Sequence, residues 1–164
     1  MRWLVLLTVL LVTTVVIWPA RGDAPDAPAV HPSVWKMAAS PGGETLYVAC
    51  GGNGTIAVID VAARERVRTL DVGGRPRGLT VSDDGALLAV TFERDDVAVL
   101  YDLPGLAERA RVRVGADPEG LAFTKDGARL YVANRLSQDV SLVDVGAARE
   151  VRRITCGREP FALV

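Results

Sequence analysis

The sequence predicts an all-β fold, a β-propeller built of four-stranded antiparallel blades, and three observations support this prediction. Two β-rich runs separated by a polar turn occur three times, at residues 46–60, 88–102 and 130–144. An aspartate ends each copy, and the three aspartates lie 42 residues apart, at Asp60, Asp102 and Asp144. Prolines recur on the same period, at Pro76, Pro118 and Pro160. A fixed period of about 40 to 50 residues that contains several short strands is typical of propeller blades.

The third copy shows how one repeat provides four strands. Residues 119–124, "EGLAFT", and 128–134, "ARLYVAN", are rich in residues that favour strands, and Lys-Asp-Gly joins them as a hairpin turn. Two further runs follow, "VSLVDV" at 140–145 and "VRRITCG" at 151–157. The third run of each copy is almost continuously apolar, which suits a strand that is covered by neighbouring sheets on both faces.

The repeats divide the chain into blades of equal length. We expect blade 1 at residues 34–75, blade 2 at 76–117, blade 3 at 118–159 and the first strand of a fourth blade at 160–164. Three blades and one strand make an incomplete ring, because propellers typically need four to eight blades. The sequence therefore predicts the N-terminal fragment of a longer protein.

Several single residues have local roles that the repeat predicts. Three glycines close the first hairpin of each blade, where a positive φ favours glycine: Gly43, Gly85 and Gly127. The three periodic aspartates are expected to accept backbone N–H groups in the turn that follows each of them. Cys50 and Cys156 occupy different positions of the repeat and lie in blades that are not neighbours. We expect two small buried or half-buried thiols rather than a disulfide.

The N-terminal residues predict export. Arg2 precedes an uncharged apolar run at residues 3–18, and Ala20 stands two residues before a cleavage site after Gly22. Residues 1–22 are therefore expected to form a signal helix, and the Pro- and Ala-rich residues 23–33 a linker. An uncleaved anchor is the alternative, although a helix of that run covers only about 24 Å of a bilayer core of about 30 Å. Both readings place the blades in the periplasm, outside the cell or at its surface, with membrane contact only if the helix is uncleaved.

The charge of the chain argues against nucleic acid as a partner. Removal of Arg2 and Arg21 from the 19 basic residues leaves 17, against 20 acidic residues. Phosphate binding needs Lys and Arg gathered on one face, and no such basic cluster stands out.

The inventory of reactive residues gives no catalytic site in this segment. His31 is the only histidine and lies in the linker, so the blades hold no Ser-His-Asp or multi-histidine metal arrangement. No Cys-x-x-Cys-His motif occurs, so covalent haem attachment is not expected here. We therefore expect no catalytic residue, no metal and no cofactor in this segment.

Three stretches carry a resemblance to a known family: "RLYVANRLSQDVSLVDV", "VRRITCGREPFAL" and "GGRPRGLTVSDDGALLAV". They resemble the YVTN-type repeat of bacterial seven-bladed β-propellers, and the resemblance covers residues 34–164. It implies an exported binding or surface protein. Some members of the family carry a c-type cytochrome domain, and others are similar to lactonases.

The candidate binding residues flank the crossover prolines and are expected at the rim of the central channel: Arg75, Arg77, Glu119, Arg158 and Glu159. The three arginines could together hold a carboxylate or another anion; the alternative is that they are solvated loop residues. Asn53, Asn134 and Arg135 begin the loops after the second strands. We expect these loops on the opposite face, as turns rather than ligand sites.

These observations predict an exported propeller that acts as a binding or scaffold module, with a protein or a small anionic ligand at the rim. One alternative is the propeller part of a periplasmic redox protein whose haem domain lies outside this segment. A lactonase-like hydrolase is a third candidate, which the lack of acid–base clusters on the inner strands disfavours.

Overall fold

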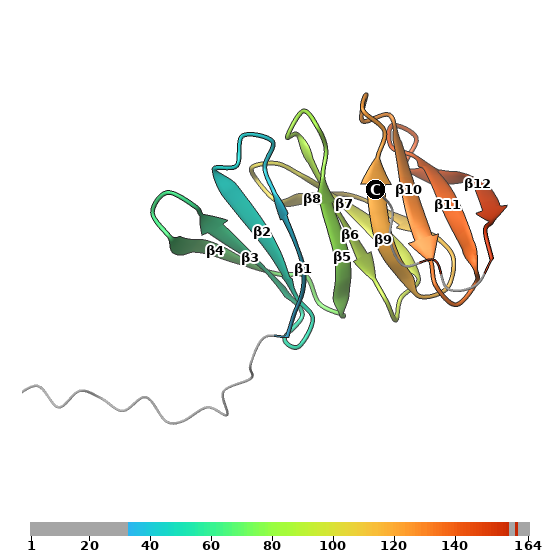
Figure 1. The fold of residues 1–164 in the computed structure, drawn as a ribbon, viewed down its shortest axis with the longest axis horizontal. Helices are drawn as coiled ribbons and strands as arrows, with labels where there is room; N and C mark the ends of the chain where they lie inside the picture. Colours follow the sequence, from blue (N-terminus) through green and yellow to red (C-terminus); the bar gives the residue numbers. More distant parts are fainter. Residues whose placement is uncertain (1–32, 158–159, 161–164) are drawn as a thin grey trace, which may run out of the picture.

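The computed structural model describes residues 33–157 and 160, and this part of the chain consists of strands and turns with no helix. Twelve strands form three separate four-stranded antiparallel sheets, which stand side by side like the sectors of a fan (Figure 1). The predicted all-β fold with three antiparallel blades is confirmed. The predicted signal helix at residues 1–22 and the linker up to residue 32 lie outside the described residues. So does the expected strand of a fourth blade, of which only Pro160 is described.

In each sheet the strands follow chain order from the innermost to the outermost. Blade 1 contains β1 (Val34–Ala39), β2 (Thr45–Cys50), β3 (Thr55–Asp60) and β4 (Glu65–Asp71). Blade 2 contains β5 (Pro76–Val81), β6 (Leu87–Phe92), β7 (Val97–Asp102) and β8 (Ala107–Arg113). Blade 3 contains β9 (Pro118–Phe123), β10 (Arg129–Asn134), β11 (Asp139–Asp144) and β12 (Arg149–Thr155).

The core lies between the sheets because the middle strands are apolar on both faces. Every residue of β6 is buried. Leu88, Val90 and Phe92 pack against blade 1, while Leu87 and Ala89 pack against blade 3. Burial of apolar surface at about 25 cal/mol per Å² is the main force that holds one blade against the next. The innermost strands β1, β5 and β9 lie next to one another, so the residues that begin them share one end of the molecule.

The turns follow the local predictions closely. Gly43, Gly85 and Gly127 have φ values of +80°, +71° and +66°. The Asp60 carboxylate accepts the N–H of Ala63 at 2.8 Å, and Asp144 accepts that of Ala147 at 2.9 Å. Asp102 differs: it pairs with Arg109 at 2.9 Å, and Pro104 stands in the turn that follows it.

The two cysteines are free thiols in different surroundings. Cys50 is buried in blade 1, as predicted. The prediction of a buried or half-buried site is wrong for Cys156, which is exposed. The equivalent Val72 and Val114 pack in the cores between neighbouring blades, whereas no further blade is described beyond blade 3. In the described part of the chain, no helix has the length and hydropathy needed to cross a membrane.

Candidate functional site

A β-bulge in the innermost strand of each blade brings three equivalent residues together. In blade 2, Pro76 pairs with Phe92 but Leu79 pairs with Val90, so Arg77 and Gly78 stand opposite the single residue Thr91. The same irregularity occurs at Glu119 in blade 3 and at Trp35 in blade 1. Bulges bend a strand and redirect its side chains, and they are frequent near functional sites.

Arg77 is the centre of the resulting cluster. Its guanidinium carbon lies 3.8 Å from the centroid of the Trp35 ring. Its Nη1 and Nη2 pair with Glu93 at 3.3 Å and with Glu119 at 3.4 Å. The guanidinium of Arg75 lies over the same ring at 5.3 Å. The structure thus brings Arg75, Arg77 and Glu119 together, whereas the candidates Arg158 and Glu159 lie outside the described residues.

The two arginines of this cluster have different electrostatic surroundings. Two carboxylates from the chain itself balance the charge of Arg77, so an anion from outside would have to compete with them. Within residues 33–157, no acidic group lies within 4.0 Å of the Arg75 guanidinium. Arg75 is therefore better suited than Arg77 to bind an anion from outside. That three arginines together bind one anion stays a prediction.

A close backbone contact fixes blade 2 against blade 3 at this level. A Cβ atom on Gly78 would stand 1.8 Å from the carbonyl oxygen of Glu119, so only glycine allows the two inner strands to approach this closely. The buried Thr91 hydroxyl accepts the N–H of Gly78 at 2.8 Å and donates to the carbonyl of Glu119 at 3.2 Å. These contacts hold Glu119 in reach of Arg77.

The loops after the second strands lie on the same rim as the crossovers, which corrects the prediction of an opposite face. The N–H of Glu93 donates to the carbonyl of Arg75 at 3.4 Å, and that of Arg135 to the carbonyl of Asp117 at 2.9 Å. In an antiparallel sheet the second strand ends where the first begins, so both segments must share one end. We call this end the crossover rim: residues 51–54, 73–77, 93–96, 115–119 and 134–138.

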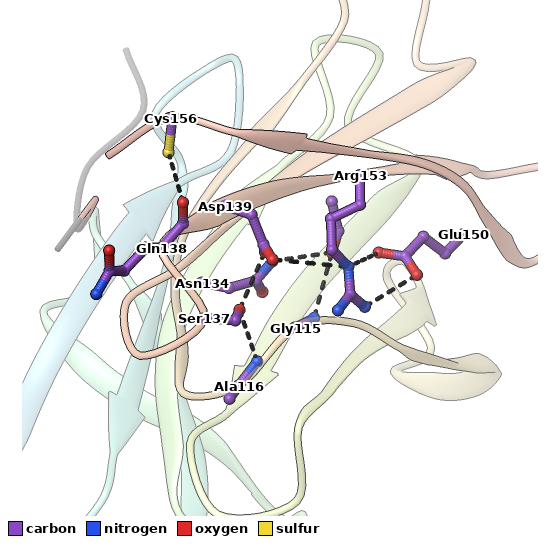
Figure 2. A network of polar contacts seen from close by, with 10 residues as sticks. Gly115, Ala116, Asn134, Ser137, Gln138, Asp139, Glu150, Arg153 and Cys156 are labelled. Carbon is purple, nitrogen blue, oxygen red and sulfur yellow. Dashed lines mark hydrogen bonds and ion pairs between the residues drawn. The ribbon is translucent and has the colours of Figure 1, made fainter. Parts of the chain in front are cut away.

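Blade 3 anchors its crossover with a buried polar network that the sequence reasoning did not find (Figure 2). Asn134, predicted as a turn residue, is fully buried. Its Nδ2 donates to Asp139 at 2.7 Å and to Ser141 at 2.9 Å. The hydroxyl of Ser141 accepts the N–H of Gly115 at 3.2 Å, and that of Ser137 accepts the N–H of Ala116 at 3.0 Å. The network therefore binds the crossover that leads into blade 3.

A signal for this network does exist in the sequence. The equivalent positions of blade 2 are apolar, while blade 3 has polar residues at all of them: Asn134, Asp139 and Ser141 in place of Phe92, Val97 and Val99. Three coordinated changes from apolar to polar at core positions indicate a shared hydrogen-bond network.

A pocket of about 460 Å³ opens on the crossover rim between blades 1 and 2. Glycines line most of it: Gly51, Gly52 and Gly54 come from the β2–β3 loop, and Gly73 and Gly74 from the crossover. Asn53 and two arginines complete the wall, Arg75 and Arg94. The charged side chains that line it are arginines, and two carboxylates stand next to its glycines: Asp71 accepts the N–H of Gly73 at 3.0 Å, and Asp95 lies 2.9 Å from where a Cβ on Gly74 would be.

A second pocket of about 470 Å³ lies between blades 2 and 3 at the other end of the sheets. Its carboxylates accept hydrogen bonds within the turns that contain them. A hydrogen bond from Ser82 and one from the Ala86 N–H lower the pKa of Asp84. Thr124 and the Ala128 N–H lower the pKa of Asp126 in the same way. Among the described residues, no group of three or more His, Cys, Asp or Glu side chains is arranged to hold a metal ion.

Comparison with solved structures supports a β-propeller fold, and the similar structures include a WD40-repeat protein. No model of a protein family matches it, and no curated protein does. Hydrazine synthase from Kuenenia stuttgartiensis superposes with a TM-score of 0.75 and 25% identity, over 80% of this chain and 38% of that one. U3-55K gives 0.72 and 15%, over 79% and 41%. The WD40 repeats of RRP9 give 0.71 and 15%, over 79% and 40%. The chain thus spans about two fifths of the length of these structures.

Proposed function

We propose that this protein is an exported propeller of the YVTN type that acts as a binding or scaffold module, with its partner docked on the crossover rim. One observation carries the proposal: the inner-strand bulges gather an aromatic ring, arginines and glutamates from separate blades at one end of the molecule. Aromatic and arginine side chains supply most of the energy at protein interfaces. The partner is a protein, and it contacts Trp35 and Arg75 first.

The packing of the rim supports a binding role. Arg77 is held by its ring and its two ion pairs, so little side-chain entropy is lost when a partner docks. The three blades support the rim, because a hydrophobic core fills each of the two interfaces between neighbouring blades. The similarity to a WD40-repeat structure supports a scaffold role.

Site-specific photocrosslinking tests the proposal. A benzoylphenylalanine placed at Leu136, exposed on the crossover rim, reports on the rim, and one placed at Arg66, exposed on the outer strand β4, is the control. In the native host we expect the Leu136 position to give one defined adduct, identified by mass spectrometry, which the Arg66 position does not give. The same set of adducts from both positions, or none from either, would contradict the proposal.

Export is tested on the mature protein. Its N-terminal residue should be Asp23, following cleavage after Gly22, and the protein should be recovered outside the cytoplasm. A product that begins at Met1 and stays in the cytoplasm would overturn this part of the proposal.

The similarity to hydrazine synthase, an enzyme by its name, favours a second candidate. In this candidate the blades are the propeller part of a redox enzyme, and a haem domain lies in another portion of the protein. A haem stain of the full-length product from the native host decides between the two, because covalently bound haem survives denaturing electrophoresis.

A further inference from the structure

The glycine-lined pocket on the crossover rim has a wall of main chain rather than of side chains. Three of its glycines have positive φ values: +69° at Gly54, +63° at Gly73 and +58° at Gly74. A Cβ on Gly54 would lie 2.9 Å from the carbonyl oxygen of Gly74, so the two loops pack directly against each other. These glycines keep the pocket free of side chains and bring its backbone close to an occupant.

Both arginines of the pocket lack an internal counter-ion. Arg75 is partly buried beside Trp35, and Arg94 is exposed. No ion pair within 4.0 Å joins either of them to an acid of the described chain, and the nearby Glu93 is bound to Arg77. The pocket therefore presents two guanidinium groups without an ion-pair partner, because the neighbouring Asp71 and Asp95 contact its glycines and not its arginines.

The equivalent place between blades 2 and 3 is occupied by the protein's own carboxylates. Asp117 replaces Arg75 there, and Asp96 replaces Gly54. Asp117 is only 5% exposed and pairs with Arg135, and its N–H donates to Asp96 at 3.0 Å. One crossover thus pairs its buried acid with an arginine, while at the other the neighbouring acids Asp71 and Asp95 form no ion pair with the pocket arginines.

We propose that the pocket between blades 1 and 2 binds a carboxylate side chain of an acidic peptide segment, through Arg75 and Arg94. This inference rests on the proposed function, because it names the chemistry by which the partner is recognised. A carboxylate accepts paired N–H groups from each guanidinium, and Trp35 limits the orientations of Arg75. The occupant is part of a peptide, because Gly52, Asn53, Gly73 and Arg94 are all exposed and the pocket does not enclose a small molecule.

Binding of a labelled acidic peptide to the full chain tests the inference. The probe is hexaglutamate with fluorescein at its N-terminus, and the measurement is fluorescence anisotropy at low salt, where charge pairing is least screened. We expect Arg94→Ala to raise Kd about tenfold and the double variant Arg75→Ala/Arg94→Ala to raise it further. The matched control Arg66→Ala should leave Kd unchanged. Labelled hexaglutamine, used in place of the hexaglutamate probe, should show no measurable binding.

A second variant keeps the test independent of the arginines. Gly52 lies outside the left-handed region of φ, so Gly52→Asp adds a carboxylate to the pocket wall without backbone strain. We expect it to abolish hexaglutamate binding with an unchanged melting temperature. Equal Kd values for Gly52→Asp, Arg94→Ala and the unchanged protein would overturn the inference.

Competition distinguishes the sources of the anion. Citrate and inorganic phosphate at the same anion concentration should displace the peptide only weakly; displacement as effective as that by unlabelled hexaglutamate would show a small-oxyanion site and overturn the peptide assignment. A defined adduct from the Leu136 crosslinker together with no effect of Gly52→Asp would reject this inference and leave the proposed function standing. If the adduct is absent while hexaglutamate still binds and its binding depends on Arg94, the proposed function is rejected and this inference stands.

Discussion

Blades 2 and 3 anchor their crossovers with different residues at equivalent positions. In blade 2, the ring of Phe92 and the carboxylate of Asp95 lie 3.1 and 2.9 Å from where a Cβ on Gly74 would be. In blade 3, the equivalent Asn134 and Ser137 lie 2.5 and 2.4 Å from where a Cβ on Gly115, one repeat position earlier, would be. The position of Phe92 and Asn134 therefore accepts either a packed ring or a member of a hydrogen-bond network.

The packed ring of blade 2 and the hydrogen-bond network of blade 3 differ in how they tolerate substitutions. An apolar contact depends on shape, and its parts contribute nearly independently. A buried polar network depends on all its members, because each unpaired polar group costs free energy.

The largest loss of stability is expected when Phe92 of blade 2 is replaced by asparagine, the residue at the equivalent position of blade 3. Phe92 is 1% exposed, and its neighbours Val97 and Val99 offer no hydrogen-bond partner. Phe92→Asn should lower the free energy of unfolding by about 4 kcal/mol, through lost packing and an unpaired amide. Urea unfolding measures this, with Leu136→Asn, at a 63% exposed position, as the control. An unchanged urea midpoint would contradict the prediction.

Transfer of the whole network sharpens the same comparison. The triple variant Phe92→Asn/Val97→Asp/Val99→Ser supplies the amide with the partners that it has in blade 3. We expect it to be more stable than the sum of the three single changes indicates, because the new groups pair with one another. Strict additivity would show that the surroundings of blade 2 do not support the network.

The reciprocal change in blade 3 has a smaller effect. Asn134→Ala removes the donor to Asp139 and Ser141, and both acceptors are buried. The expected loss is about 2 kcal/mol in urea unfolding. Asn53→Ala, at the exposed position of the β2–β3 loop, should stay within about 0.5 kcal/mol. Equal losses for the two variants would remove the distinction between a network residue and a turn residue.

Arg77 tests whether the rim cluster stabilises the fold. Its ion pairs are partly exposed, so they should contribute less than about 1 kcal/mol. Arg77→Met keeps part of the stacking on Trp35, while Arg77→Ala loses it, and the second variant should melt slightly lower. A large drop for both would mean that the cluster holds blades 1, 2 and 3 together rather than serving a partner.

The smallest effect concerns the hairpin turns in acid. Hydrogen bonds lower the pKa of Asp84 and of Asp126 from the ordinary value of 3.8. A lowered folded-state pKa adds stability above 3.8, and this stability is lost as the pH falls below 3.8 towards the folded-state pKa. Thermal melts between pH 7 and pH 2.5 should therefore show a decline that is weaker in Asp84→Asn/Asp126→Asn. An identical decline in the variant would assign the acid sensitivity to other groups.

The repeat predicted most of the fold because strand pattern and turn chemistry are local. Apolar runs, hairpin glycines and the acceptors Asp60 and Asp144 all depend on residues close in the chain, so each copy could be read by itself. The errors arose where local patterns conflict with packing: Asn134 has the sequence of a turn residue but lies inside the sheet interface.

The candidate site was predicted only in part for a related reason. Arg75, Arg77 and Glu119 were found from the crossover prolines. Their mutual contacts and the link to Trp35 and Glu93 were not found, because they depend on a one-residue bulge that has no clear sequence signature.

The sequence by itself determined the strands, the blade period and the positive-φ glycines, because these follow from side-chain alternation and backbone sterics within a few residues. Only the tertiary structure decided which charges are paired within the chain and which are available to a partner. That choice depends on distances between separate blades: Arg77 meets Glu119 across 42 residues of chain, whereas Arg75 and Arg94 line a pocket without an ion-pair partner among the described residues.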